Sequence, residues 1–271
     1  MTYAAFPNLA KSSYEIDVAG EVIRSPVLDG LLWLTHGMTT RRFAGPDLDV
    51  FDLMEQVRRR LAPGGARLFC GEQVHGARVE TIAAPRRDSG AERVAARGPI
   101  VQLPDTDALV VSDPALPIAV RTADCVPLLL VDVRKKRVAA VHAGWRGSLA
   151  RISEKAVAAM AEQGSDVAEL VAWMGPTISR AAYAVGAELS ETFCAAFPEY
   201  EGIVEDEHLD LVLLNACQLR AAGVPAAQIH AANYCTVAHR DVCYSYRGEH
   251  ASNGRMVLCA MILSPDTDHD E

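Results

Sequence analysis

The chain has 271 residues and a mass of 29.2 kDa, of which 50% are hydrophobic and 23% charged, as is usual for a globular protein and not for a disordered one. The 35 acidic and 26 basic residues give a net charge of -9, which argues against nucleic acid and anionic membranes as partners. The longest apolar runs, such as residues 126–131, are far shorter than the ~18 residues of a membrane-spanning helix, and the N-terminus lacks the pattern of a signal peptide. We therefore expect a cytoplasmic protein.

The strands are predicted in the middle of the chain. No repeat, low-complexity tract or long linker divides the sequence, so we treat residues 1–271 as one domain. Residues 83–99, rich in charge, Gly and Pro, predict an exposed excursion. Runs rich in Val, Leu and Ala then predict consecutive buried strands at 108–111, 118–121, 127–133 and 137–142.

Two helices are predicted after these strands. Residues 148–163 carry apolar side chains at helical spacing, and Gly164 stands where a C-terminal cap is expected. Residues 209–222 repeat the pattern, and Gly223 follows as a stop signal.

The C-terminal region predicts a β-hairpin. Two β-rich runs, at 243–246 and 256–263, flank the dipeptide Asn253-Gly254, which is a strong signal for a tight turn.

The seven cysteines indicate neither a disulfide framework nor a zinc ribbon. Their number is odd, they are scattered, and no two of them have CxxC spacing. This usage is typical of a reduced, intracellular protein.

Three residues could carry chemistry together. His142 follows a buried strand and precedes a Gly-rich turn and a helix, which is a common location for a ligand. Cys125 lies between two apolar runs, and His75 lies in a short segment with a glycine beside it. Two imidazoles and one thiolate suit zinc, and three protein ligands leave a fourth position open for water or substrate. The separations of 50 and 17 residues match no local zinc signature, and Cys125 could equally be a nucleophile with a histidine as its base.

Several charged residues are candidate substrate contacts. Arg41, Arg146 and Arg247 could each bind a phosphate through a bidentate contact. Asp124 is a further candidate, because it interrupts an otherwise apolar stretch where a polar group is costly unless it is paired or functional.

The motifs QVHG (73–76), TADC (122–125) and HAGWRG (142–147) resemble, in order and spacing, the bacterial YfiH/YlmD-type family, also labelled the laccase-domain or polyphenol oxidase family. Weaker similarity extends from residue 35 to the end of the predicted hairpin. The resemblance implies a single α/β domain with layered mixed sheets and flanking helices. It also implies a zinc ion held by His75, Cys125 and His142.

The resemblance further implies chemistry on purine nucleosides. Members of the family are described as phosphorolysing adenosine, inosine, guanosine and methylthioadenosine and as deaminating adenosine, so the expected partners are a small nucleoside and phosphate. The H-x-E and P-C-x-x-C signature of zinc nucleobase deaminases is absent from this sequence. Any deamination would therefore use a different arrangement.

Three alternatives stay open at this stage. A copper-dependent phenol oxidase is less expected, because a four-copper enzyme needs on the order of ten histidine ligands and this chain has 8 histidines. A Cys/His hydrolase would use Cys125 as its nucleophile without a metal. A metal-stabilised binding protein would use the same ligands without turnover.

Overall fold

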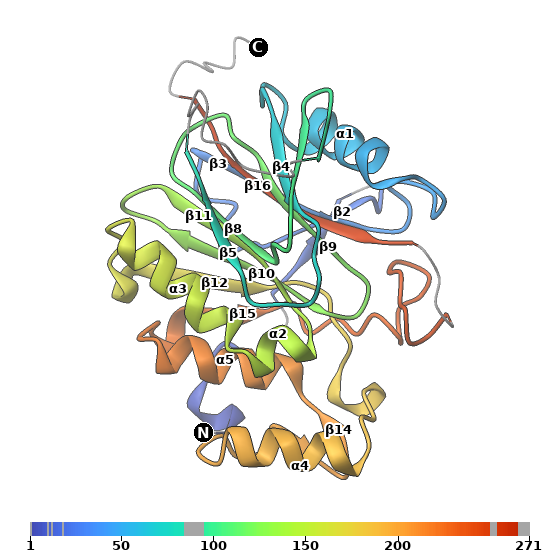
Figure 1. The fold of residues 1–271 in the computed structure, drawn as a ribbon, viewed down its shortest axis with the longest axis vertical. Coiled ribbons are helices and arrows are strands. Elements are labelled where there is room, and N and C mark those ends of the chain that lie inside the picture. Colours follow the sequence, from blue (N-terminus) through green and yellow to red (C-terminus); the bar gives the residue numbers. More distant parts are fainter. Residues whose placement is uncertain are drawn as a thin grey trace.

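Two β-sheets packed face to face form the centre of the molecule, and helices cover the outer face of each sheet (Figure 1). The structure is a computed structural model that describes residues 2–9, 11, 13–17, 19–83, 95–249 and 254–264. No helix within these ranges is long and apolar enough to cross a membrane.

The first sheet has six strands and mixed pairing. Its order is β15 (Ile229–Ala231), β12 (Leu170–Met174), β10 (Val126–Asp132), β11 (Arg137–Ala143), β8 (Ala108–Val111) and β5 (Val79–Ile82). The outermost pairs on both sides are parallel, and the central pairs are antiparallel.

The second sheet has eight strands and is also mixed. Its order is β1 (Glu15–Ile16), β2 (Val22–Arg24), β3 (Leu34–Thr39), β16 (Met256–Ile262), β9 (Ile118–Thr122), β4 (Leu68–Gly71), β7 (Ile100–Leu103) and β6 (Ala95–Arg97). A separate short ribbon pairs β13 (Val204–Glu205) with β14 (His208–Leu209).

Five α-helices and four short 3₁₀ segments are present in the described part of the chain. The α-helices are α1 (Val50–Leu61), α2 (Trp145–Leu149), α3 (Ile152–Glu162), α4 (Ala187–Ala196) and α5 (Leu211–Ala221). The 3₁₀ segments are Tyr3–Ala5, Val167–Glu169, Arg180–Ala182 and Ala226–Gln228.

Alternation along the central strands divides the core into layers. Leu129 and Val131 of β10 face the second sheet, whereas Leu128 and Leu130 face the helices α3 and α5. The far side of the second sheet packs against α1. Because successive side chains of a strand point to opposite faces, a strand that is apolar throughout is buried on both sides. The result is a four-layer arrangement of helix, sheet, sheet and helices, which confirms the predicted α/β class of mixed sheets with flanking helices (Figure 1).

The four predicted strands are confirmed, and their ends differ from the prediction by at most one residue. The helix predicted at 209–222 is also confirmed as α5, which begins after Asp210, whose side chain accepts a hydrogen bond from the Leu213 amide at 2.8 Å. Residues 84–94 of the predicted excursion lie outside the described residues. Its end at 95–97 is the exposed strand β6 rather than a loop.

The prediction of one helix over 148–163 is wrong. The structure has α2 and α3 instead, separated at Ala150 and Arg151. Arg151 has a φ of 61°, in the left-handed region, where the pattern of i to i−4 hydrogen bonds ends. At the C-terminus of α3, Gly164 has a φ of 90° and is the expected cap: its amide donates to Ala161 O, and the next amide donates to Met160 O.

The predicted C-terminal hairpin is also wrong. The last strand, β16, pairs with β3 and β9, both distant in sequence, while residues 243–246 lie in no strand. Asn253 of the predicted turn lies outside the described residues. A turn signal describes only neighbouring residues, and here the long-range partners of β16 decide the pairing.

Candidate metal centre

His142 and Cys125 come together because they lie at the same end of one antiparallel strand pair. In the register of β10 and β11, Pro127 is opposite His142, and Cys125 directly precedes β10. Gly144 makes the close approach possible: a Cβ at this position would lie 2.8 Å from Cys125 Sγ and 3.0 Å from a ring carbon of His75. Gly144 is therefore required because a side chain would not fit, and not because of its backbone conformation, since any residue can adopt its φ of -79°.

Two of the three residues lie where the chain crosses from one sheet to the other. His75 follows β4 of the eight-stranded sheet and precedes β5 of the six-stranded sheet. Cys125 likewise lies between β9 of the eight-stranded sheet and β10 of the six-stranded sheet. The candidate site therefore forms at one edge of the interface between the sheets.

Asp107 holds the histidines in place. Its carboxylate accepts hydrogen bonds from the amides of Val74 at 3.2 Å, His75 at 3.1 Å and Gly76 at 2.7 Å. The same carboxylate lies 2.8 Å from Nδ1 of His142. This buried residue thus fixes both the loop that carries His75, whose φ is 61°, and the ring of His142.

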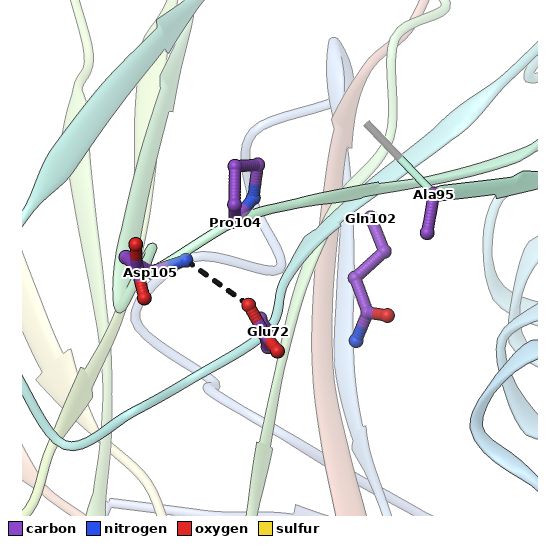
Figure 2. A pocket seen from close by; sticks show the side chains of 5 residues that line it. All are labelled: Glu72, Ala95, Gln102, Pro104 and Asp105. Atoms are coloured by element: carbon purple, nitrogen blue, oxygen red, sulfur yellow. Dashed lines mark hydrogen bonds between the residues drawn. The ribbon is translucent and has the colours of Figure 1, made fainter. Parts of the chain in front are cut away.

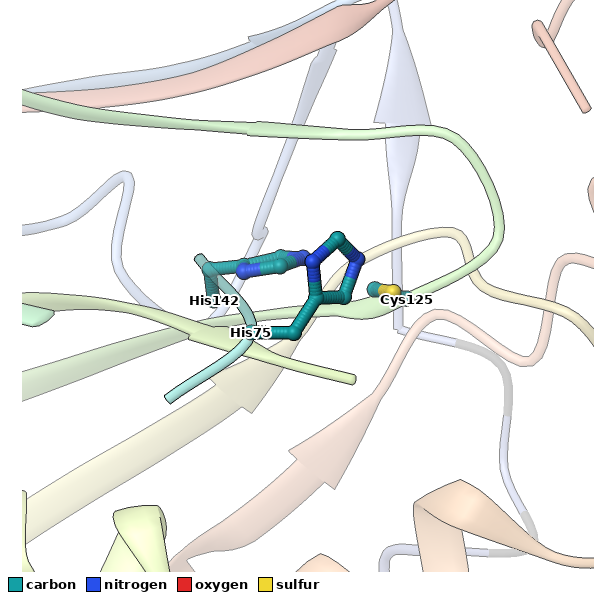
Figure 3. A group of neighbouring side chains, drawn as sticks. All are labelled: His75, Cys125 and His142. Carbon is teal, nitrogen blue, oxygen red and sulfur yellow. The ribbon is translucent and has the colours of Figure 1, made fainter. Parts of the chain in front are cut away.

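The side chains of His75, Cys125 and His142 converge, and their potential ligand atoms all lie within 4.8 Å of one another. Figure 3 shows the two rings beside the sulfur, and the rings meet edge to face at 4.8 Å between centroids. His142 is buried, Cys125 is half-buried and His75 is exposed. The group therefore opens to one side of the molecule.

The charges of this group favour a thiolate. Burial raises the pKa of the Cys125 thiol, but the positive charge of His142 and hydrogen bonds from both histidines outweigh it and lower the pKa to about 6. Burial lowers the pKa of His142, and the negative charges of Cys125 and Asp107 outweigh it and raise the pKa to about 9. A thiolate is the form of cysteine that binds a metal or acts as a nucleophile.

These residues fit a metal ion. Two imidazole nitrogens and a thiolate form a soft donor set of the kind that zinc prefers. Because Nδ1 of His142 faces Asp107, Nε2 is the nitrogen left for a ligand, and a carboxylate behind a histidine is the usual support of a metal-binding imidazole. Among the described residues this is the one group of three or more potential ligands that lie close together.

A cavity of about 590 Å³ surrounds the group. Its wall combines aromatic rings with positive charge, and the residues that contribute them are Trp145, Tyr183, Tyr246, Arg121, Arg146, Arg247 and Arg255. Tyr246 is 54% exposed, so the rim offers an open aromatic surface. Such a wall suits a planar ring bearing or accompanied by an anion.

Residues 47–263 match the protein family described as multi-copper polyphenol oxidoreductase laccase. The chain belongs to this laccase-domain family. An adenosine deaminase from an unknown prokaryotic organism is 34% identical over 228 residues, which cover 81% of this chain and 84% of that protein. A purine nucleoside phosphorylase of Mycobacterium bovis is 35% identical over 237 residues, which cover 80% and 88%.

Two further comparisons support the family. A purine nucleoside phosphorylase of Bacteroides thetaiotaomicron is 36% identical over 163 residues, which cover 58% of this chain and 60% of that protein, less than two thirds of its length. The crystal structure of YlmD from Geobacillus stearothermophilus has a TM-score of 0.81 and 25% identity, and the match covers 93% of this chain and all of that one. The resemblance to YfiH and YlmD in sequence is thereby confirmed.

The predicted substrate contacts of this laccase-domain protein divide into two groups. Asp124, Arg146 and Arg247 line the cavity. Arg41 is not part of its lining, and its guanidinium instead pairs with Glu249 at 2.8 Å. The charge of Arg41 is therefore already paired within the chain.

The carboxylate and the backbone carbonyl of Asp124 accept hydrogen bonds from other residues of the chain. One carboxylate oxygen accepts from the Thr236 hydroxyl at 2.5 Å and the other from the Arg247 amide at 2.6 Å. Its backbone carbonyl accepts from the Thr177 hydroxyl at 2.6 Å. Asp124 therefore fixes the segment just before Cys125 and the position of Arg247, in addition to lining the cavity.

Asp107 is one of the residues of the site that the sequence did not indicate, as are Tyr183 and Arg255 in the cavity lining. Asp107 stands in an ordinary turn, Pro-Asp-Thr-Asp, before a buried strand, and no spacing connects it with the histidines. Its complete burial and its four hydrogen-bond donors are visible only once the strands are paired.

A second, smaller cavity of about 370 Å³ lies near β6 and β7. Figure 2 shows its lining, in which the carboxylate of Glu72 turns toward the amide of Asp105, at 3.4 Å. It contains none of the three converging side chains and no aromatic ring. The larger cavity is therefore the candidate active site.

Proposed function

We propose that this protein is a zinc-dependent purine nucleoside phosphorylase that also deaminates adenosine, with residues 1–271 acting as one catalytic domain. The observation that carries the proposal is that His75, Cys125 and His142 open into a cavity whose wall bears aromatic rings and guanidinium groups. The names of the relatives, a phosphorylase and a deaminase of purine nucleosides, support the same reading.

The cavity has groups that complement the purine ring and the phosphate of the proposed reaction. Trp145, Tyr183 and Tyr246 offer ring faces and edges to a purine. Arg146 and Arg247 offer charge to phosphate. The same features would accept adenosine, inosine, guanosine and methylthioadenosine, which share the purine ring and a ribose.

The proposed phosphorolysis joins a phosphate oxygen to C1′ of the ribose while the bond from C1′ to the purine nitrogen breaks. The electron pair of that bond leaves with the purine, which takes up a proton. Guanidinium groups hold the phosphate close to C1′, and such positioning supplies a large part of the rate. Zinc, when bound by His75, Cys125 and His142, supplies a Lewis acid at the wall of the cavity.

We favour zinc over copper because of the types of ligand atoms and the number of histidines at the site. A thiolate with two imidazoles and an open position is typical of a catalytic zinc site. A four-copper oxidase needs on the order of ten histidine ligands, and within the described residues two histidines share the one group. Metal analysis of the purified protein, with oxygen uptake on a phenol as the second assay, separates the two readings.

The direct test is product analysis after incubation with adenosine, with and without phosphate. We expect adenine only with phosphate and inosine in both reactions. Cys125→Ser should lose bound zinc and both products together, whereas Cys194→Ser, at an exposed cysteine, should keep them. A Cys125→Ser protein that lacks zinc and retains full turnover would refute the proposal.

A second candidate function is a metal-independent hydrolase. The order Cys125, His142 and Asp107 matches a nucleophile, a base and the carboxylate that orients the base, with Asp107 2.8 Å from His142. Alkylation of Cys125 that is blocked by substrate and insensitive to chelators would favour it. Loss of turnover on chelation, restored by zinc, would favour the metal enzyme.

A further inference from the structure

Arg121 is a cationic residue of the cavity whose hydrogen bonds within the described residues all go to neutral acceptors. It lies on β9 and lines the cavity. Its guanidinium donates to Gln73 Oε1 at 3.3 Å and to the carbonyl oxygens of Gly71 at 3.3 Å and Glu72 at 3.2 Å. All of these acceptors are neutral, so they orient the guanidinium without neutralising it.

No carboxylate of the described residues pairs with this guanidinium. Glu72 contributes only its backbone carbonyl, because its carboxylate turns toward Asp105 at the smaller cavity (Figure 2). Asp124, the acidic residue of the larger cavity's lining, already accepts hydrogen bonds at both oxygens. The positive charge of Arg121 therefore lies at the cavity without a carboxylate partner in the described part of the chain.

The surroundings oppose this charge. Burial lowers the pKa of Arg121 and the nearby positive charge of Arg255 lowers it further, while the Cys70 sulfur acts in the opposite direction without reversing the shift. A half-buried guanidinium without a counter-charge costs free energy, and a bound anion offsets that cost.

Gln73 makes the position of Arg121 rigid. The Gln73 amide donates to Arg121 O at 2.7 Å and accepts from Arg121 N at 2.8 Å, so the side chain bridges the backbone of β9. Gln73 itself has a φ of 57° and lies two residues before His75. The guanidinium is thereby fixed relative to the loop that carries the first candidate ligand.

We propose that Arg121, oriented by Gln73, forms an anion subsite of the cavity that binds a phosphoryl group, either free orthophosphate or the phosphate of a nucleotide. The planar guanidinium suits two oxygens of such a group. The inference rests on the proposed function and deepens it, because a subsite for orthophosphate is needed for phosphorolysis and not for deamination.

The test is calorimetric titration of the full-length, zinc-loaded protein with sodium orthophosphate, adenosine 5′-monophosphate and adenosine separately. Arg121→Met keeps the apolar stem and removes the charge, and Arg121→Lys keeps the charge and removes the planar fork. Arg59→Met, at a side chain 71% exposed on α1, is the matched control for net charge. Melting curves establish that each variant is folded.

We expect Arg121→Met to bind the phosphoryl ligand about 10- to 100-fold more weakly and Arg121→Lys to lose less, as fits the loss of charge-assisted hydrogen bonds. Adenosine binding should stay within about twofold of the starting protein, since adenosine carries no charge for the subsite to pair. Loss of orthophosphate binding assigns the subsite to the free anion. Loss confined to the monophosphate assigns it to a nucleotide.

Equal losses for adenosine and for both phosphate ligands, or no loss for any of them, would overturn the subsite. If Arg121→Met does not fold, the same comparison is made with Arg121→Lys, for which a smaller loss of affinity for the phosphoryl ligand is expected. Because titration requires no turnover, an inactive protein that binds phosphate through Arg121 would refute the proposed activity and leave the subsite standing. Phosphorolysis by the protein, with phosphate binding unchanged in both Arg121 variants, would support the proposed activity and refute the subsite.

Discussion

At the scale of single residues, Asp107 is the side chain on which the candidate metal centre depends most. In Asp107→Asn the new amide group would face N–H groups that now point at oxygen, and the negative charge behind His142 would be lost. We expect zinc affinity to fall about 10- to 100-fold, as is usual when the carboxylate behind a metal-binding histidine is removed. Competition titration with a chelating dye measures it.

Asp105→Asn is the matched control, because Asp105 lies two residues away at the smaller cavity and its side chain does not contact the histidines. Equal zinc affinity in the two variants would show that Asp107 does not support the site.

His36 makes stability depend on pH. This buried imidazole accepts a hydrogen bond from the Ser25 amide at 3.1 Å, and burial, with the charge of Arg24, lowers its pKa to about 4. In the unfolded chain the pKa of this imidazole is about 6.5. Between pH 6.5 and pH 4 the unfolded state is therefore protonated at His36 while the native state is not, and protonation favours unfolding. The free energy of unfolding is therefore unaffected by protonation of His36 above pH 6.5 and decreases as the pH falls toward 4.

Between pH 7 and pH 5 this loss amounts to about 2 kcal/mol. Urea denaturation at the two pH values should show that the starting protein loses about this much more stability than His36→Gln, which can still accept from Ser25 and does not titrate. Parallel losses in the two proteins would assign the pH dependence to other groups.

At the scale of elements, one buried polar network joins α2, α3 and α5. Asn215 of α5 accepts from the Ser153 hydroxyl at 2.7 Å and donates to the Ser148 hydroxyl at 3.0 Å. Gln218 donates to the Ser148 carbonyl at 2.6 Å. Because α2 begins three residues after His142, this network connects the helical layer with the candidate site.

Asn215→Leu would leave the hydroxyls of Ser148 and Ser153 buried without their partner, at a cost of about 2–4 kcal/mol in the free energy of unfolding. Adding Ser153→Ala should recover part of that loss, because one unsatisfied hydroxyl is then removed. A double-mutant cycle in urea measures the coupling. Additive losses would show that the two side chains act independently.

The same scale shows what the sequence can and cannot predict. The central strands were predictable because β10 and β11 are apolar on both faces and are bounded by turn signals. The break at Arg151 was not, since the apolar spacing continues through it and a left-handed φ leaves no mark in the pattern. The partners of β16 are more than 100 residues away along the chain, and no local signal names them.

The residues of the candidate site also fall into those that the sequence indicated and those that only the structure shows. The ligand chemistry of the residues, together with the motif resemblance, indicated the three converging side chains, and the phosphate-binding chemistry of arginine indicated Arg146 and Arg247 at the cavity. Asp107 and the role of Arg121 follow only from the pairing of strands, because their partners lie tens of residues away along the chain.

At the scale of the whole molecule, a metal at this site should stabilise the fold. Zinc that binds the native and not the unfolded chain adds about 3 kcal/mol at a free concentration 100-fold above its dissociation constant. We therefore expect zinc to raise the melting midpoint of the starting protein and of Cys194→Ser by several degrees, and to leave Cys125→Ser unchanged. Scanning calorimetry with and without zinc provides the measurement, and an equal shift in all three would mean that zinc binds elsewhere.

The position of His75 and Cys125 at the two crossings between the sheets has a consequence for how such chains can diverge. Each residue is held by the strands on either side of it, and the segment between them begins and ends at the same edge of the sandwich. Insertions or deletions in the connections between the strands of that segment can therefore accumulate without moving either side chain, as long as the strands and Asp107 keep their places. A search for relatives should accordingly allow a variable gap between the motifs of His75 and Cys125, but a nearly constant gap between those of Cys125 and His142, because a single strand pair joins the latter two.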